Sequence, residues 1–390
     1  MSCLAKVKDG IPFFDPWINE ADKAAVCGAF ESRWLTGGPK AVEFEKLFAE
    51  SVGSKYAVCV NSCTAALHLA MRSLGIGPGD EVIVPVLTFA ATANAPIFCG
   101  ARPVFADIDE KTYNIAPQSI VDKISKKTKA IIVVHYGGQP CDMKEIMNIA
   151  EDYDLPVVED SAHTVGATYL GRNAGTMGVI GCFSFYPTKI ITTLEGGMFV
   201  TNDEAIGKIA KNLREHGMSK NAADRERGAA WYYDVMDLGY NYRLTEVQAA
   251  IGISQLKRLD DINRMRVNAA NKYSELLREV DGIITPFEAK DRTHAYHLYV
   301  IRVLEKEFGI SRDKLFVELS NKKIGLSVHY TPLHLLTYYR NLLHYNVGDF
   351  PVAEKIYPEI LSLPIFPTIT EAQIAEVVNQ IKVAKKISQG

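Results

Sequence analysis

A hydroxyl-bearing segment at residues 61–67, NSCTAAL, follows a short apolar run that ends at Val60. Ser62 and Thr64 stand where a helix would begin, and the start of a helix leaves backbone N–H groups pointing outward beside these hydroxyls. Such a start binds anions, and a phosphate suits it. Taken alone, the same residues are also the pattern of a plain helix cap.

Two acidic residues, Glu159 and Asp160, stand at the end of another apolar run. A carboxylate at the mouth of a buried strand must be paired or lose its solvation, and here it would face the crevice where parallel sheets bind ligands. One of the two acids is expected to be structural.

Lys189 follows a third apolar run, in the segment SFYPTK at residues 184–189, and precedes TTLEGG at 192–197. Burial disfavours the charged form of a lysine, so its neutral amine becomes available as a Schiff-base nucleophile. Pyridoxal 5′-phosphate needs an anion site, an acid that faces a cationic nitrogen, and a nucleophilic amine. The three segments together therefore predict this cofactor, although each alone has a simpler structural explanation.

Seven short apolar runs that alternate with amphipathic stretches would position these side chains. This alternation predicts an α/β fold with a mostly parallel sheet between layers of helices. The three segments would then lie at the carboxyl ends of strands, where such sheets bind ligands. The expected strands are 56–60, 81–86, 103–107, 130–135, 156–159, 181–185 and 197–201, and the expected helices are 41–52, 64–74, 119–125 and 142–153.

The pattern changes after Thr245, where the period becomes purely helical until about Val280. A strand at 297–303 and a final amphipathic helix at 371–387 then predict a smaller α+β unit. The sequence thus predicts a large cofactor-binding domain at residues 1–255 and a small C-terminal domain at 256–390.

Composition restricts the class of protein. Lys plus Arg number 43 and Asp plus Glu 46, and a net charge of −3 without a long run of one sign argues against a nucleic-acid binder. The uncharged run 82–101 is long enough to cross a membrane, but Pro85 and Pro96 favour a strand followed by a short buried helix. Because the N-terminus has no signal-peptide pattern and the seven cysteines include no CxxC, we expect a cytoplasmic protein with free thiols.

Two further patterns are not expected to carry chemistry. The glycine-rich segment 75–79 follows a helix and leads into a strand, which is the reverse of a dinucleotide-binding loop, so it predicts a turn. His294 and His297 stand three apart, but no HExxH motif or cysteine partner accompanies them, and no metal site is predicted.

Five longer motifs occur in the same order as in one enzyme family. Through them, and along nearly the whole chain, the sequence resembles the DegT/DnrJ/EryC1/StrS family of sugar aminotransferases. The resemblance implies a fold-type I pyridoxal-phosphate enzyme that forms a homodimer with active sites shared between subunits. The motifs are NSCTAALHLA, GDEVIVPVLTFAATANA, PVVEDSAHTVGA, GCFSFYPTKIITTLEGGMFVTND and LGYNYRLTEVQAAIG.

The resemblance also implies roles for individual residues. Lys189 would form the Schiff base with the cofactor, Asp160 would pair with the pyridine nitrogen, and Phe89 would stack on the ring. The remaining implied cofactor contacts are Thr64, Ala65 and Ser184 to the phosphate, His163 beside the ring, and Asn241 to the phosphate from the other subunit. The implied substrate pocket contains Tyr186, His329, Tyr330 and His334.

The sequence departs from the family pattern at three positions. Cys63 stands where many members have Gly, Leu194 interrupts the usual TTGEGG, and His163 replaces a frequent Gln. The first two affect the phosphate loop, and the third would change the hydrogen bond to the phenolic oxygen of the cofactor. None of them removes a catalytic group.

The resulting hypothesis is a transaminase of amino sugar and polysaccharide biosynthesis. It would move an amino group from L-glutamate to a nucleotide-linked keto sugar, at carbon 4 of a 4-keto-6-deoxyhexose bound to UDP, dTDP or GDP. Amination at carbon 3 or of a cyclitol ketone stays open, as does a non-catalytic regulatory protein that binds the cofactor. Sugar 3-dehydration is disfavoured, because that branch of the family has His in place of the Schiff-base lysine.

Overall fold

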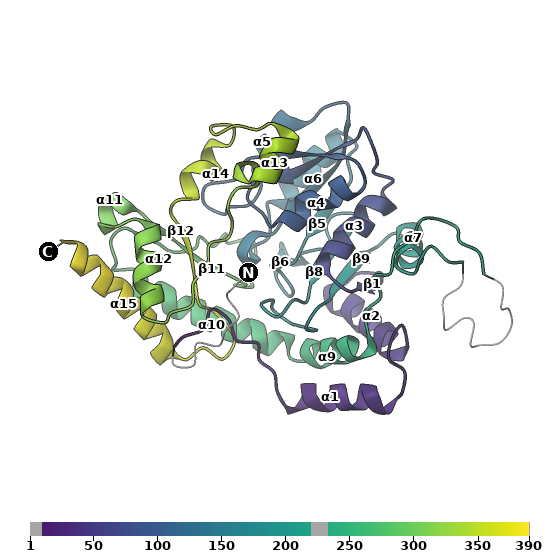
Figure 1. Cartoon of the computed structure of the whole chain (residues 1–390), viewed down its shortest axis with the longest axis horizontal. Coiled ribbons are helices and arrows are strands. Elements are labelled where there is room, and N and C mark those ends of the chain that lie inside the picture. The colour runs from purple at the N-terminus through teal and green to yellow at the C-terminus, as the bar shows by residue number, and fades with distance from the viewer. Residues whose placement is uncertain (1–9, 220–232, 390) are drawn as a thin grey trace.

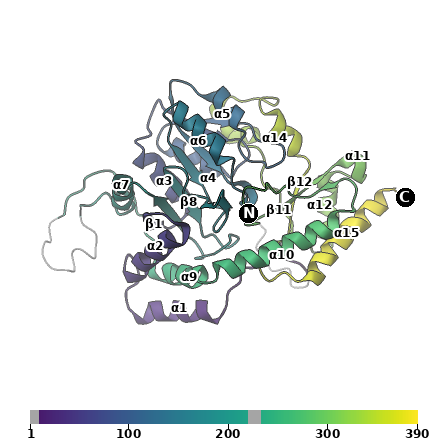
Figure 2. The same ribbon diagram turned by 180° about the vertical axis from the view of Figure 1, so that it is seen from behind.

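The described part of the chain, residues 10–219 and 233–389, comes from a computed structural model. It forms two packed units, a larger one around a seven-stranded sheet and a smaller one around a three-stranded sheet (Figure 1). The long helix α10, Leu259–Leu277, leads from the larger unit into the smaller one and lies along the lower edge of the molecule in the view from behind (Figure 2).

The large sheet has the strand order β1-β9-β8-β5-β4-β2-β3. Strand β9 runs antiparallel to both of its neighbours, and the other neighbouring strands pair in parallel. Every strand predicted for this sheet is present, with ends shifted by at most two residues, so the prediction of a mostly parallel α/β fold is confirmed. The strands are β1 Tyr56–Val60, β2 Glu81–Pro85, β3 Arg102–Ala106, β4 Thr128–Val134, β5 Val157–Asp160, β8 Ile180–Ser184 and β9 Gly197–Thr201.

Helices cover both faces of this sheet, because successive residues of a strand point to opposite faces. On β2, Val82 and Val84 pack into one core and Ile83 packs into another. The first core also contains residues of α3 and α4, and the second contains residues of α5 and α6. The helices of the larger unit are α1 Glu20–Glu31, α2 Pro39–Val52, α3 Cys63–Ser73, α4 Ala90–Phe98, α5 Pro117–Lys123, α6 Met143–Asp152, α7 Glu204–Arg214 and α9 Glu246–Leu256.

The smaller unit has its own core, which includes Tyr273, Leu315 and Val377. Ile11 from the N-terminal segment lies in the same core and forms a bridge with Ile324, so the unit is not built from the C-terminal segment alone. Its elements are α10, β10 Ile283–Ile284, β11 Tyr299–Val303, α11 Glu305–Phe308, α12 Arg312–Asn321, β12 Ile360–Leu363 and α15 Glu371–Gln389.

Two short helices, α13 Thr337–Leu343 and α14 Pro351–Ile356, return to the larger unit. Tyr339 and Phe350 pack around Phe105 of β3, with ring centroids 5.9 and 6.2 Å away.

The continuous helix predicted over 245–280 is instead two helices, since α9 ends at Leu256 and α10 begins at Leu259. The predicted domain boundary at residue 255 lies one residue before the end of α9.

The uncharged run 82–101 forms β2 and α4, as predicted, and both are largely buried in the larger unit. No helix within the described ranges is long and apolar enough to cross a membrane. The glycine-rich segment before this run is the predicted turn, in which Gly75 and Gly79 adopt positive φ angles of 71° and 93°.

Candidate active site

The two carboxylates at the end of β5 point to opposite faces of the sheet, because they are consecutive strand residues. Glu159 is fully buried and accepts from four donors at 2.5–2.8 Å. Its Oε2 contacts His135 Nε2 and the amide of Gly175, and its Oε1 accepts from the amides of Met177 and Gly178. These bonds make Glu159 the structural acid of the pair.

Asp160 has a different environment. Its Oδ2 accepts from the Thr92 hydroxyl at 2.8 Å, its Oδ1 accepts from the amide of Ala162 at 3.2 Å, and no ion pair to it occurs among the described residues. Burial raises the pKa of the Asp160 carboxyl, although both hydrogen bonds and the charge of Lys189 oppose this shift. Asp160 is thus a buried acid that still lacks a cationic partner.

Lys189 lies in the loop after β8, in the electrostatic neighbourhood of Asp160. Burial lowers the pKa of its amine from 10.5 to about 8, while Asp160 opposes the shift. Its Nζ lies 3.5 Å from Nε2 of His297, whose ring packs against that of His163 with centroids 4.3 Å apart. The structure therefore brings together an amine that is easily deprotonated, a buried acid and two imidazoles.

Hydrogen bonds determine which nitrogen of His163 carries its proton. The Gly137 amide donates to Nδ1 at 3.2 Å, and Nε2 lies 3.2 Å from the Tyr330 hydroxyl. Burial and the charge of Lys189 lower the pKa of His163 well below its usual value, so the ring is neutral. Because Nδ1 accepts, the neutral ring carries its hydrogen on Nε2.

The start of α3 forms another side of this region. The Ser62 hydroxyl caps the helix by accepting from the Ala65 amide at 3.1 Å, and Thr64 lies half-buried in the same first turn. Gly197 of β9 packs directly on this turn, since a Cβ there would lie 2.5 Å from the carbonyl carbon of Ser62. The first amides of a helix have no intrahelical acceptor, so those before Ala65 remain available to an anion.

An aromatic side chain stands beside this group. Phe89 precedes α4 and is 60% exposed, which is unusual for a phenylalanine at the carboxyl edge of a buried strand. Its ring lies 5.9 Å from that of Tyr330. A flat ligand that covered Phe89 would remove this apolar surface from water.

Several other predicted site residues occupy distinct positions. Ser184, at the end of β8, is buried, and Tyr186 two residues later is half-buried, with its amide 3.4 Å from the Ser184 hydroxyl. His329 binds Ser362 through Nδ1 at 2.8 Å and stacks on Phe13. These residues stay candidates for the phosphate and substrate contacts.

His334 and Asn241 are not brought into contact with Lys189. His334 is fully buried, with Nε2 2.9 Å from Glu354 and its ring 4.7 Å from that of Phe350. The side chain of Asn241 is exposed and forms no hydrogen bond among the described residues, while its carbonyl lies 3.5 Å from Nδ2 of Asn61. Thr245, rather than Asn241, caps helix α9.

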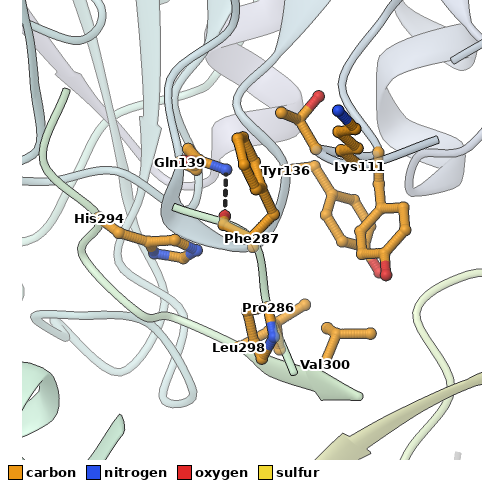
Figure 3. Close-up of a pocket in the computed structure, with 11 residues that line it drawn as sticks. Lys111, Tyr136, Gln139, Pro286, Phe287, His294, Leu298 and Val300 are labelled. Atoms are coloured by element: carbon orange, nitrogen blue, oxygen red, sulfur yellow. Dashed lines mark hydrogen bonds between the residues drawn. The ribbon is translucent and has the colours of Figure 1, made fainter. Parts of the chain in front are cut away.

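A separate pocket is lined by residues that include Lys111, Tyr136 and Val300 (Figure 3). Gln139 closes one side by donating to the Phe287 carbonyl at 2.9 Å. The pocket contains neither Lys189 nor Asp160, but two of its wall residues support the site: Gly137 binds His163, and the Tyr136 hydroxyl donates to the His329 carbonyl. The pocket therefore shares wall residues that hold His163 and His329 in place, but it does not contain the reactive side chains.

Two residues of the site were not predicted from the sequence. Thr92 lies within the apolar run 82–101, where it gave no sign of a bond to Asp160. His297 was considered only as a metal ligand, yet it contacts Lys189 from the residues that precede β11. A histidine just before a buried strand of the smaller unit is the signal that could have pointed to it.

Comparisons with known proteins show the family to which the chain belongs. A model of the DegT/DnrJ/EryC1/StrS aminotransferase family matches residues 16–382. The spore coat polysaccharide biosynthesis protein SpsC of Bacillus subtilis is 45% identical over 374 residues, which span 95% of this chain and 96% of that protein.

Solved structures are similar over nearly the whole chain. The aminotransferase TlmJ from Streptoalloteichus hindustanus has a TM-score of 0.90 and 34% identity, over 97% of this chain and 100% of that chain. The putative sugar aminotransferase Spr1654 from Streptococcus pneumoniae has a TM-score of 0.91 in its PMP form and 0.90 in its PLP form. Its identity is 30% and 29%, over 97% of this chain and 100% and 99% of those chains.

Proposed function

This chain belongs to the DegT/DnrJ/EryC1/StrS aminotransferase family, and from that premise we propose that it transfers an amino group from L-glutamate to carbon 4 of a nucleotide-linked 4-keto-6-deoxyhexose. It is a fold-type I sugar aminotransferase that depends on pyridoxal 5′-phosphate. The proposed substrate carries UDP, dTDP or GDP, and the product would enter polysaccharide biosynthesis.

The described residues fit this cofactor at three points. Asp160 is a buried carboxylate without an ion pair among these residues, as a partner for a cationic ring nitrogen should be. The first turn of α3 offers the amide of Thr64 to a phosphate, beside the Ala65 amide that donates to the Ser62 hydroxyl. The exposed ring of Phe89 offers a surface on which a flat ring can stack.

The proposed mechanism assigns two tasks to Lys189 and one to Asp160. When bound, pyridoxal 5′-phosphate supplies an aldehyde that takes up an amine and a ring that accepts electrons from the neighbouring carbon. Lys189 would hold the cofactor through its amine and, once freed, would accept on Nζ the proton that leaves the α-carbon of the donor. Asp160 would keep the ring nitrogen protonated by its opposite charge. The observation that carries this proposal is the position of Lys189, in the loop after β8 and in the electrostatic neighbourhood of Asp160, a buried acid without an ion pair among the described residues.

The cofactor contacts proposed beyond these two residues follow the same geometry. Ser184 would join the first turn of α3 at the phosphate, and His163 would lie beside the ring. The proposed substrate contacts are Tyr186, His329 and Tyr330. His334 was also predicted to bind substrate, but its buried contacts with Glu354 and Phe350 support a packing role instead.

We also propose a homodimer in which Asn241 reaches the phosphate of the other subunit. Its side chain is exposed and has no partner in its own described chain, which supports such a role. Exposed apolar residues near it in sequence, Val235, Met236 and Leu238, would be covered by a second subunit. The proposed compartment is the cytoplasm, in keeping with six described cysteines that are all free thiols.

The proposed substrate can be tested directly. The purified enzyme, loaded with pyridoxal 5′-phosphate, is incubated with L-glutamate and UDP-, dTDP- or GDP-linked 4-keto sugars while 2-oxoglutarate is measured. We expect one nucleotide to be strongly preferred. Formation of 2-oxoglutarate only with 3-keto sugars or cyclitol ketones would contradict the assignment of carbon 4.

A further inference from the structure

A directed chain of hydrogen bonds leads from the backbone to Tyr330. A backbone amide can only donate, so the contact from Gly137 fixes Nδ1 of His163 as an acceptor. The hydrogen of the neutral ring is therefore on Nε2, and Nε2 donates to the Tyr330 hydroxyl oxygen at 3.2 Å. Each bond thus determines the direction of the next.

The hydroxyl hydrogen of Tyr330 is then left for another acceptor. Tyr330 Oη has one hydrogen-bond partner among the described residues, which is His163. Because the oxygen accepts from His163, its own hydrogen must point elsewhere. No described side chain takes this hydrogen, so the acceptor is expected to be a ligand.

The position of Tyr330 indicates which ligand that would be. One side of its ring neighbours Phe89, with centroids 5.9 Å apart, and its hydroxyl contacts His163, which packs on the partner of Lys189. Tyr330 therefore belongs to the same group of side chains as the reactive amine, to which it is linked through His163 and His297. The group of a keto sugar that must enter this group of side chains to receive the amino group is its carbonyl.

We propose that Tyr330 is a catalytic residue that donates a hydrogen bond to the ketone oxygen of the sugar substrate, with His163 and the Gly137 amide fixing it as a donor. This inference rests on the proposed function, because it requires a keto sugar in the site. It assigns Tyr330 to the reacting atoms and not to the diphosphate or a sugar hydroxyl.

Chemistry favours a neutral donor at this place. A ketone oxygen gains negative charge when an amine attacks its carbon, and a donor already aimed at that oxygen stabilises the charge without reorganising. Burial, together with the charge of Asp160, raises the pKa of the Tyr330 hydroxyl well above 10, so it keeps its hydrogen throughout the working pH range. No proton has to leave Tyr330 for this role.

The two halves of the reaction separate this role from a structural one. In the first half, glutamate converts the PLP form to the PMP form without any sugar present; in the second, the keto sugar converts the PMP form back. For Tyr330→Phe, which removes only the hydroxyl, we expect the second half to slow by about a hundredfold and the first by at most about threefold. Equal slowing of both halves, or normal rates in both, would overturn the proposal.

A matched control uses the same substitution at a distant tyrosine. Tyr273 is fully buried in the smaller unit, where its hydroxyl donates to the Pro364 carbonyl at 2.9 Å. Tyr273→Phe should leave the ratio of the two half-reaction rates at the wild-type value. A changed ratio in this control would mean that the loss of any buried phenol disturbs the site, and the Tyr330 result would then not support the proposal.

Equilibrium binding gives a readout that does not depend on turnover. Calorimetry compares a nucleotide-linked 4-keto sugar with its 4-deoxy analogue, which has no oxygen at that carbon, on the PLP form without glutamate. We expect Tyr330→Phe to weaken binding of the keto sugar by about fivefold and binding of the deoxy sugar not at all. Equal weakening of both ligands would contradict a bond to the ketone oxygen.

The role of His163 as the donor to Tyr330 can be tested with two substitutions. Glutamine offers an amide N–H where His163 offers Nε2–H, whereas leucine offers none. We expect His163→Gln to keep most of the sugar half-reaction rate and His163→Leu to lose about tenfold more. Identical rates for the two variants would show that no donor at this position is required.

The result for wild-type enzyme distinguishes failure of this inference from failure of the proposed function. If no nucleotide-linked keto sugar converts the wild-type PMP form back, the proposed function fails and the inference fails with it. If a keto sugar does so and Tyr330→Phe matches wild type, only the inference fails.

Discussion

Two neighbouring carboxylates at the end of β5 lie on opposite faces of the sheet and differ in how completely they are hydrogen-bonded. Glu159 accepts from four donors, whereas Asp160, the next residue, accepts from two neutral donors and has no ion pair among the described residues. A buried acid whose oxygens are fully bonded stabilises the fold. One that is only partly bonded is ready for a ligand.

Histidines show the same contrast. On the Glu159 face, His135 uses both ring nitrogens, since Nε2 contacts Glu159 at 2.8 Å and Nδ1 accepts from the Cys141 amide at 3.0 Å. On the Asp160 face, Nδ1 of His297 is buried without a partner in the described part of the chain, and its Nε2 meets Lys189. At the end of β5, complete bonding therefore separates Glu159 and His135 from Asp160 and His297.

The largest effect is expected at Asp160. Asp160→Asn keeps the shape of the side chain but removes the charge proposed to hold the ring nitrogen protonated. Turnover should fall roughly a thousandfold or more, because the carbanion loses several kcal/mol of stabilisation. Steady-state kinetics measures this loss, and urea unfolding should show wild-type stability. Near-normal turnover would remove Asp160 from the mechanism.

The matching substitution at Glu159 should affect stability instead. In Glu159→Gln, the amide nitrogen would face a backbone N–H that now donates to the carboxylate, and one buried donor would lose its acceptor. We expect the free energy of unfolding to fall by about 2–4 kcal/mol. Urea unfolding gives this change, while turnover per folded molecule should stay within a few-fold of wild type. A thousandfold loss of turnover would reverse the roles assigned to the two acids.

Asn241 extends the comparison to a side-chain amide that forms no hydrogen bond among the described residues. Lys189→Ala and Asn241→Ala, each nearly inactive alone, should recover up to about a quarter of wild-type activity when mixed after reversible dissociation. Half of the dimers would be mixed, and one of the two sites in each would carry both an intact Lys189 and the partner's intact Asn241.

The alternative for Asn241 is a contribution to its own site, beside Asn61. In that case every site with an intact Lys189 would still carry its own altered Asn241, and mixing would restore nothing. A mixed sample with no more activity than the separate variants would therefore rule out the shared site.

The smallest expected effect concerns the pH at which the Lys189 amine becomes reactive, which should be lower than for an ordinary lysine. Burial lowers the pKa of its amine to about 8, so the neutral, nucleophilic form dominates above that pH. In protein freed of cofactor, the rate of Lys189 acetylation should rise with a midpoint near pH 8. Mass spectrometry of the peptides follows this rate, with exposed Lys46 as the internal reference. A midpoint for Lys189 at the ordinary lysine value of 10.5 would contradict the lowered pKa.

The sheet could be predicted from the sequence because buried strands of a parallel sheet appear as continuous apolar runs. The segment 56–60 matches β1, and Lys189 and Asp160 follow runs of the same kind. The break between α9 and α10 could not be predicted, since neither Pro nor Gly marks it and only the packing of the two units requires it.

Contacts between distant segments account for the remaining differences. His334 lies in a motif that resembles a substrate loop, but the return of α14 to the larger unit places Glu354 and Phe350 against it. His297 meets Lys189 only because the smaller unit packs across the carboxyl edge of the large sheet. Neither contact follows from local spacing, because both partners are fixed by tertiary structure.

The central claim is that Lys189, which neighbours the incompletely bonded Asp160, holds the cofactor. Treating the enzyme loaded with pyridoxal 5′-phosphate with borohydride and mapping the modified peptide tests this claim most directly. The account predicts that the reduced cofactor is attached to Lys189 and that Lys189→Ala retains no covalently bound cofactor after the same treatment. Stoichiometric attachment to any other lysine would contradict it.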